Sequence, residues 1–428
     1  MNYKLVEITP QEHDDFVKSC KYGEVTQLYN WQYVKKNWQA LNIGVQRDGD
    51  LIAVALILLK KLPVVGKNLA YIAKGPAMDY DNLEDVKGVI SALKQFCKEH
   101  KCFSMKMDPV VDINTHRELL DTINIMGAKH QGLEKGFLYT QPRYYMICDI
   151  DKDEKEVLNS FQPRTRSLVK KSMKNGLICE KCGRDELPKF AEIMKITGER
   201  DEFTNRDLDY FERVYDSLSK TDDVDLYLTK LIPEDVEAFY KNELKDIESS
   251  RNRINKKLEK EVSESKKANF TNELEVLDNR EKRAKDLISQ MEEHKKNKVT
   301  EIVLSGALLT FCGEKAYYLY GASSNDYRDL SPNYLMQWTM MREAMSRGCT
   351  SYDFGGVTGF TPEDKVYDHD GGLYEFKKRF GTYMLETIGE FDIVIDSLMY
   401  KMFNTALNLR KSHLQAKKKK NHKRENNQ

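Results

Sequence analysis

Cationic and hydroxyl side chains gather in the segment 199–206, ERDEFTNR, which lies between two stretches of helical periodicity. Guanidinium groups bind carboxylates and phosphates through paired hydrogen bonds, and the Thr204 hydroxyl adds another polar group. This segment is therefore a candidate anion clamp. Another cation, Lys35, lies between Trp31 and Trp38, whose heptad spacing places both indoles on one face of a predicted helix. A surface lysine beside core aromatics produces the same pattern, and it is the favoured interpretation from the residues alone.

A second basic segment is the predicted helix 161–174, which reads FQPRTRSLVKKSMK. Charge of this density suits contacts with phosphates, although a solvated helix face is a commoner cause. Two carboxylates, Asp108 and Asp353, each follow a predicted strand. Either can serve as a general base, but Asp-Pro and Asp-Phe-Gly sequences are equally typical of structural turns.

Several motifs of known chemistry are absent from the sequence. It has no GxGxxG or GxxxxGK[ST] loop for nucleotide phosphates and no GxSxG nucleophile. The Asp353 triplet DFG lacks the other kinase loops, and the CxxC of Cys179 and Cys182 lacks a second pair, so we expect no metal. Without a nucleophile motif, direct transfer between two bound substrates is favoured, which depends on positioning and electrostatics.

The stretch 301–381 shows the elements that would position such groups. Two β-prone runs, 302–311 and 316–320, flank a glycine turn and predict a hairpin. A helix opened by Ser331 and Pro332 and a strand that runs into two glycines follow. Strand, strand, helix and strand in this order predict an α/β or α+β fold.

The rest of the chain divides by composition. Residues 1–147 predict a first α/β unit, and residues 148–238 together with 299–395 predict a second. Between the two parts of the second unit, residues 239–298 contain no proline or glycine and carry apolar residues at heptad spacing in two blocks. We therefore expect an inserted antiparallel coiled-coil arm. Residues 396–428 predict a C-terminal helix and a basic tail.

Charge and hydropathy bound the cellular setting. The 428 residues contain 68 Lys and Arg against 68 Asp and Glu, so no global field attracts a polyanion. The longest apolar run, 51–59, is too short to span a bilayer, and the start has no signal-peptide core. Eight unevenly spaced cysteines fit reduced thiols. These features predict a soluble intracellular protein, whose basic tail is either solvated or attracted to a membrane surface or nucleic acid.

The segments KITGERDEFTNRDLDYF, YYLYGASSNDYRDLSPN and GLYEFKKRFGTY resemble the Fem family of non-ribosomal peptidyltransferases, with a likeness that runs to about residue 400. The resemblance implies two acetyltransferase-like (GNAT) subdomains, the second split by a helical arm. It implies transfer of an amino acid, with glycine expected, from charged tRNA to the side-chain amine of the third stem-peptide residue of lipid II. It implies no cofactor, other Fem proteins as partners, and a cytoplasmic enzyme at the inner membrane face.

The resemblance also implies which residues bind the acceptor. Lys35 and Trp38 match the family's precursor-binding W…K..W segment. Thr204, Arg206 and Tyr210 match a TxRxxxY motif that contacts the diphosphate and sugar of the precursor. A pyrophosphate needs fixed cations, and Lys35 and Arg206 would supply one from each subdomain.

For the transfer itself, Phe376 and Lys377 match the pair that the family places at the acyl-transfer centre, and Tyr320 matches a further binding residue for which neighbouring tyrosines compete. Aminolysis of an ester passes through an oxyanion, which the Lys377 ammonium can stabilise. The attacking amine must be neutral, so Asp108 and Asp353 are candidate bases. A substrate phosphate or carboxylate can take the proton instead.

Two other functions remain open on the sequence. A GNAT enzyme that uses acyl-CoA would carry an [RQ]xxGx[GA] turn for the pyrophosphate, and no convincing copy is present. A non-enzymatic adaptor would use the arm to recruit partners, and it would not depend on Lys377. The arm is expected to be a spacer, a tRNA contact or a dimer contact. Alanine or serine in place of glycine would use similar residues.

Overall fold

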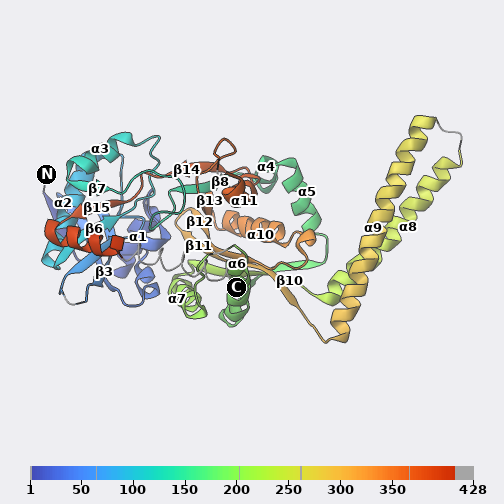
Figure 1. Ribbon diagram of the computed structural model, residues 1–428, viewed down its shortest axis with the longest axis horizontal. Coiled ribbons are helices and arrows are strands. Elements are labelled where there is room, and N and C mark those ends of the chain that lie inside the picture. The colour runs from blue at the N-terminus through green and yellow to red at the C-terminus, as the bar shows by residue number, and fades with distance from the viewer. Residues whose placement is uncertain (1, 64, 202, 261–262, 366, 410–428) are drawn as a thin grey trace, which may run out of the picture.

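The computed structural model describes residues 2–63, 65–201, 203–260, 263–365 and 367–409. Two β-sheets form the body, and a pair of long helices projects from it on the side of the second sheet (Figure 1). The protein is therefore mixed α/β with an inserted helical arm, as the sequence predicts. Among the residues that the structure describes, no helix combines the length and hydropathy that crossing a bilayer requires.

The first sheet contains a hairpin whose turn is formed by Asp48 and Gly49. Both residues have positive φ, 52° and 107°, in a two-residue turn whose twist matches that of the flanking strands. Along the sheet the strands are β1 (Tyr3–Val6), β2 (Gln39–Arg47), β3 (Asp50–Lys61), β4 (Asn68–Ile72), β6 (Cys102–Met107), β15 (Phe391–Val394) and β7 (Ala128–His130), with β5 (Ala77–Met78) beside β3. The helices of this part are α1 (Pro10–Ser19), α2 (Leu83–Glu99) and α3 (Arg117–Ile125).

Two expectations about this part are wrong. The predicted helix around Trp31 and Trp38 is a short 3-10 helix, Tyr29–Val34, so Trp31 is buried while Trp38 lies beyond the helix end and is half-buried. Strand β15 pairs with β6 and β7, so residues 391–394 lie in the first sheet although the sequence assigned them to the second subdomain. The other predicted subdomain boundaries stay a proposal.

The second sheet contains the predicted hairpin of 302–323 and the strand at Asp353. Its order is β14 (Tyr383–Glu386), β8 (Tyr144–Asp149), β13 (Ser351–Val357), β12 (Lys315–Ser323), β11 (Ile302–Cys312), β10 (Val224–Leu231) and β9 (Leu177–Cys182). The accompanying helices are α4 (Glu154–Ser160), α5 (Pro163–Ser172), α6 (Leu187–Arg200), α7 (Leu208–Leu218), α10 (Pro332–Ser346) and α11 (Tyr367–Lys378). Ser331 precedes α10 but makes no side-chain cap bond, because its backbone is left-handed.

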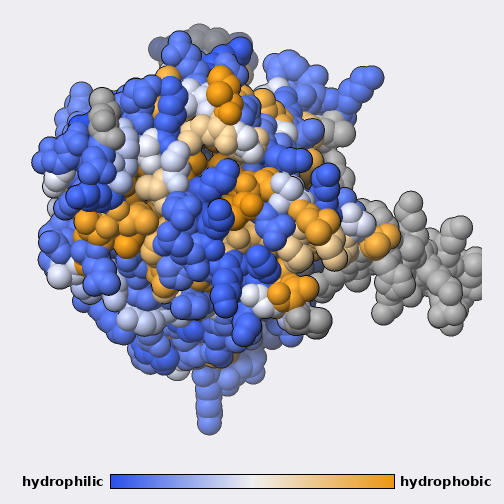
Figure 2. Space-filling view, turned by 90° about the vertical axis from the view of Figure 1, so that its left-hand side faces the viewer, coloured by the Kyte–Doolittle hydropathy of each residue, from blue (hydrophilic) through white to orange (hydrophobic). Residues whose placement is uncertain are grey.

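Packing joins the two sheets. One buried apolar cluster combines Leu56 of β3 and Val34 with Phe211 of α7 and Leu228 of β10. Shared burial of this kind disfavours independent motion of the two halves. Seen from the side of the first sheet, the surface mixes hydrophobic patches with hydrophilic side chains (Figure 2).

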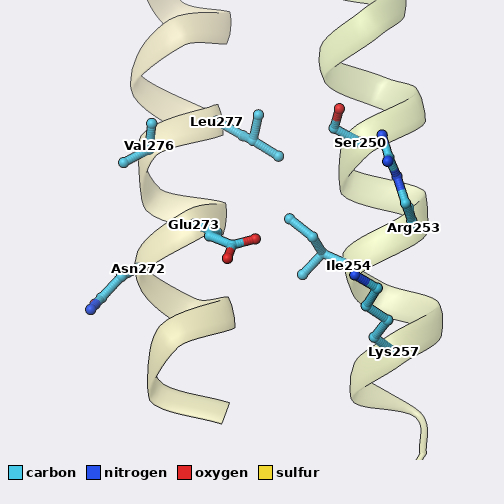
Figure 3. Close-up of a pocket in the computed structure, with 8 residues that line it drawn as sticks. All are labelled: Ser250, Arg253, Ile254, Lys257, Asn272, Glu273, Val276 and Leu277. Atoms are coloured by element: carbon cyan, nitrogen blue, oxygen red, sulfur yellow. The ribbon is translucent and has the colours of Figure 1, made fainter. Parts of the chain in front are cut away.

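The arm consists of α8 (Pro233–Leu258) and α9 (Glu264–Lys296). Its outer seam buries Ile247, Ile254 and Leu277, and its root is packed into the body through Tyr240 and Met291. The predicted coiled coil is thus confirmed. A cavity of about 480 Å³ opens along the outer seam, where the Ile254 and Leu277 side chains point toward one another across the gap (Figure 3). Residues 397–409 are helical, and the basic tail lies outside the described residues.

Candidate active site

Three cations surround the ring of Tyr210, which is on α7. The Arg206 guanidinium lies 5.0 Å from the ring centre, that of Arg213 lies 5.7 Å away, and the Lys35 Nζ lies 5.9 Å away. Burial, together with the charges of Arg206 and Arg213, lowers the pKa of Lys35 below the ordinary lysine value. Such a concentration of positive charge favours an anion with several oxygens.

Tyr210 is also held from the second sheet. Its hydroxyl lies 2.8 Å from the Tyr320 hydroxyl, which β12 supplies. Arg213 donates from Nε to the Val34 carbonyl at 3.1 Å and pairs with Asp209. The ring that the cations surround is therefore fixed in place. Thr204 is exposed in the loop before α7.

Trp38 is near both Lys35 of this cluster and Tyr71, which binds Asp108. The Trp38 backbone donates to the Lys35 carbonyl at 3.3 Å, and its indole lies 6.5 Å from the Tyr71 ring, between centres. The Tyr71 hydroxyl donates to Asp108 Oδ2 at 2.8 Å, and the Lys74 backbone N–H donates to Oδ1 at 2.6 Å. Burial raises the pKa of Asp108 to about 6, although both hydrogen bonds oppose the rise. A carboxylate of this pKa is ionised at neutral pH and matches the requirements of a general base.

Lys377, in the last turn of α11, is 4% exposed. Its Nζ donates to the Gly356 carbonyl at 2.8 Å, beside the turn in which Asp353 Oδ1 accepts from the Gly355 N–H at 2.6 Å. A Cβ on Gly355 would lie 3.6 Å from Nζ, and the φ of this residue is +80°. The contact would be an ordinary one, so it is the positive φ and not a lack of space that favours glycine in this turn. Burial lowers the pKa of Lys377, and the Asp353 carboxylate opposes this.

Phe376, the residue before Lys377, packs against other aromatic rings. Its ring lies 5.7 Å from that of Tyr334 and 5.3 Å from that of Phe380, both measured between centres. The aromatic contacts hold the end of α11 against the sheet. Phe376 is half-buried, and its packing holds the helix turn that carries Lys377.

The structure brings Lys35, Arg206, Tyr210 and Tyr320 together, although they are far apart in the sequence. Asp108 and Lys377 fall in two further groups. Sequence reasoning missed five residues that connect these groups, because none belongs to a motif: Arg213, Tyr71, Lys74, Glu24 and Tyr145. Tyr317 lies in the YYLY segment, where it counted only as a competitor of Tyr320. A cation one helical turn after Tyr210 was the available signal for Arg213.

Comparison with known proteins places this geometry in a family. The sequence profile of the FemAB family matches residues 8–408. The chain belongs to the FemAB family. It is 42% identical over 399 residues to the lipid II:glycine glycyltransferase of Staphylococcus aureus strain MRSA252, covering 92% of this chain and 94% of the relative. The crystal structure of FemX matches with a TM-score of 0.78 and 41% identity, over 93% of this chain and 99% of the other.

The match with FemX covers nearly the whole chain. The FemAB protein described here therefore has a tandem GNAT-like arrangement, as the sequence predicts. In this FemAB protein, the cation cluster lies where α7 and β12 meet the segment of Lys35, so both subdomains contribute to it.

Proposed function

We propose that this chain transfers glycine from glycyl-tRNA to the side-chain amine of the third stem-peptide residue of lipid II. The observation that carries the proposal is the 42% identity, over nearly the whole chain, to a lipid II:glycine glycyltransferase. The cluster of Lys35, Arg206 and Arg213 supports it, because lipid II presents a diphosphate that needs several cations.

The chemistry is an aminolysis. The acceptor nitrogen attacks the ester carbonyl of the aminoacyl-tRNA, a tetrahedral oxyanion forms, and its collapse breaks the bond to the tRNA 3′-terminal oxygen. The nitrogen loses one proton, and the departing oxygen gains one. The Asp108 carboxylate is the proposed base for the amine. The Lys377 ammonium is the proposed stabiliser of the oxyanion, since it uses one N–H on Gly356 and has others to offer.

The proposed donor is tRNA, and helix α5 supports this choice. Arg164, Lys170 and Lys174 are exposed on or just after the helix. The backbone N–H of Gln162, just before α5, donates to the Arg379 carbonyl at 2.9 Å, so the helix begins beside the end of α11. A row of cations that starts near Lys377 suits the phosphates of an RNA whose 3′ end reaches the transfer centre.

We propose that the protein acts at the cytoplasmic face of the cell membrane, where a lipid-linked acceptor is accessible. Exposed apolar side chains such as Leu398 and Met402, 70% and 55% exposed, support contact with a membrane surface. Peripheral association needs no spanning helix. Other members of the family are proposed partners in later additions of amino acids.

The deciding assay mixes purified protein, lipid II and tRNA charged separately with glycine, alanine or serine, and measures product mass. We expect glycine to be added, and product from only one of the other two charged tRNAs would assign a different amino acid. Product with an acyl-CoA and none with tRNA would support the GNAT alternative.

A Lys377→Ala variant separates an enzyme from an adaptor. Turnover should be lost while the fold is kept, and an adaptor would keep its function. The matched control is Lys378→Ala, because Lys378 is the exposed neighbour on the same helix. Unchanged turnover in Lys377→Ala would contradict the role given to this lysine.

A further inference from the structure

A cluster of buried charged groups lies where the two sheets meet. Glu24 and Lys74 come from the first subdomain and are 3% and 7% exposed. Asp353 is on β13 of the second sheet and Lys377 is on α11. Glu24, Lys74 and Lys377 are buried and Asp353 is half-buried, and burying charged groups is costly unless they compensate one another. Their arrangement therefore calls for a reason beyond packing.

Lys74 is at the centre of this cluster. Its Nζ lies 3.3 Å from Glu24 Oε2, 4.5 Å from the Tyr145 ring centre and 5.8 Å from the Tyr317 ring centre. Tyr317 is paired with Asp353 across β12 and β13. Lys74 thus extends from the first subdomain onto β8 and β12, the strands on either side of β13, which carries Asp353.

The backbone of Lys74 reaches the other reacting group. Its N–H donates to Asp108 Oδ1 at 2.6 Å, and its φ is 53°, in the left-handed region that lysine rarely adopts. One residue therefore contacts the proposed base through its main chain and, through its side chain, lies against the strands beside that of Asp353.

The charges form an alternating series. Burial opposes the charge of Lys74, but Tyr145, Glu24 and Asp353 outweigh it and raise the pKa of Lys74, which stays a cation. Burial, helped by the Glu24 charge, raises the pKa of Asp353, and Lys74, the Gly355 N–H and Lys377 oppose this rise. Asp353 in turn favours the charged form of Lys377. Removal of the Lys74 charge should thus raise the pKa of Asp353.

We propose that Lys74 is a positioning residue for acyl transfer: its side-chain charge, set between the strands beside Asp353, favours the charged form of that carboxyl near Lys377, and its backbone orients the Asp108 carboxylate. This inference rests on the proposed function. In this proposal one lysine of the first subdomain couples the two subdomains. Lys377, the oxyanion stabiliser, and Asp108, the base, are then both positioned only when the two sheets are packed together.

The test uses the double variant Lys74→Met/Glu24→Gln. Removing one partner alone would leave a buried charge and risk unfolding, whereas removing both replaces the pair. The first readout is NMR of the protein with ¹³Cε-labelled lysine, in which the Lys377 signal is assigned by its loss in Lys377→Arg. In the acid range this signal reports protonation of Asp353.

We expect the acid inflection of the Lys377 signal to move to higher pH in the double variant, because the Lys74 charge lowers the pKa of Asp353 more than the Glu24 charge raises it. The value of kcat should fall, while KM for lipid II stays within about twofold because the cation cluster is untouched. An Asp353→Asn variant should lower the pKa of Lys377.

The control is Lys18→Met/Asp223→Asn. This ion pair, 2.7 Å long, also joins the first subdomain to the second but, within the part of the chain that the structure describes, makes no hydrogen bond or ion pair with Asp353 or Lys377. A loss of melting temperature in both double variants with no shift in the Lys377 inflection would show that Lys74 only stabilises the interface. If the wild type adds no amino acid to lipid II, the proposed function fails, and the NMR titration still decides this inference.

Discussion

The hydroxyl groups of Tyr210 and Tyr320 lie 2.8 Å apart and connect helix α7 to strand β12. The Tyr210 ring is 7% exposed, and Phe211 packs within 5.5 Å of the Tyr320 ring, between centres. The bond therefore fixes the aromatic ring around which Lys35 and Arg206 are arranged. The geometry of the proposed diphosphate site depends on a contact between two segments that are distant in the chain.

A double-mutant cycle tests this relationship. Tyr210→Phe and Tyr320→Phe should each raise KM for lipid II. The KM of the double variant should be no higher than that of the more impaired single variant. The expected coupling is about 1 kcal/mol, the usual net value of a hydrogen bond between neutral groups. Steady-state kinetics of the four proteins measure it. Additive effects would mean that the hydroxyls act independently.

The cations should bind the acceptor rather than drive the chemistry. Lys35→Met and Arg206→Lys are expected to raise KM for lipid II by about 10- to 100-fold, since a hydrogen bond to a charged group contributes about 1.5–3 kcal/mol. Turnover at saturating lipid II should change little, because the diphosphate does not react.

The control for the cations is Lys36→Met, which removes an exposed ammonium that pairs with Asp209 at 3.1 Å. Its KM should stay near that of the wild type. An acceptor peptide without the diphosphate should bind the wild type and Lys35→Met equally. A defect that persisted with this peptide would place Lys35 elsewhere in the reaction.

The pH dependence of kcat/KM should be bell-shaped. Asp108, whose pKa burial raises to about 6, must be ionised to accept a proton, so activity should fall as pH drops through about 6. Lys377 must be protonated, and its lowered pKa places the alkaline limb below the ordinary lysine value of 10.5. In Asp108→Asn the acid limb should disappear along with most of the activity. An acid limb unchanged in that variant would exclude Asp108 as the titrating base.

Helix α5 should contribute to tRNA binding. Lys170→Glu/Lys174→Glu is expected to raise KM for glycyl-tRNA and to reduce the slope of log K against log salt by about 2, roughly one for each phosphate that is no longer neutralised. KM for lipid II should not change. The control reverses two exposed lysines of the first subdomain, Lys4→Glu/Lys98→Glu. Equal defects in both variants would indicate a general effect of net charge.

The outer part of the arm should be less stable than its root. Leu277→Ala removes an apolar side chain that is 6% exposed, at a cost of about 2–5 kcal/mol for a buried leucine. Hydrogen exchange should quicken around Ile247 and Ile254 while the helix ends near Tyr240 and Met291 stay protected by the body. Uniform exchange along both helices would contradict this division.

Local patterns in the sequence predicted the elements that local forces determine. The heptads of 239–298 predicted the arm, because neither helix can bury its apolar seam alone. Asp48 and Gly49 form a two-residue hairpin turn with positive φ, for which Asp-Gly is a typical local sequence. The helix expected around Trp31 and Trp38 failed for a related reason. Two aromatic residues at heptad spacing can indicate burial as well as an α-helix. Here Trp31 is buried by tertiary packing in a short 3-10 helix.

The sequence by itself determined the family, the two α/β units, the arm and the types of side chain that the proposed reaction needs. Only the tertiary structure decided which of them meet. It brought Tyr320 to Tyr210, and it placed Lys74 between Asp108 and the strands beside that of Asp353. The physical reason is that a buried charge is stable only beside partners from other segments, and no local pattern records which segments those are.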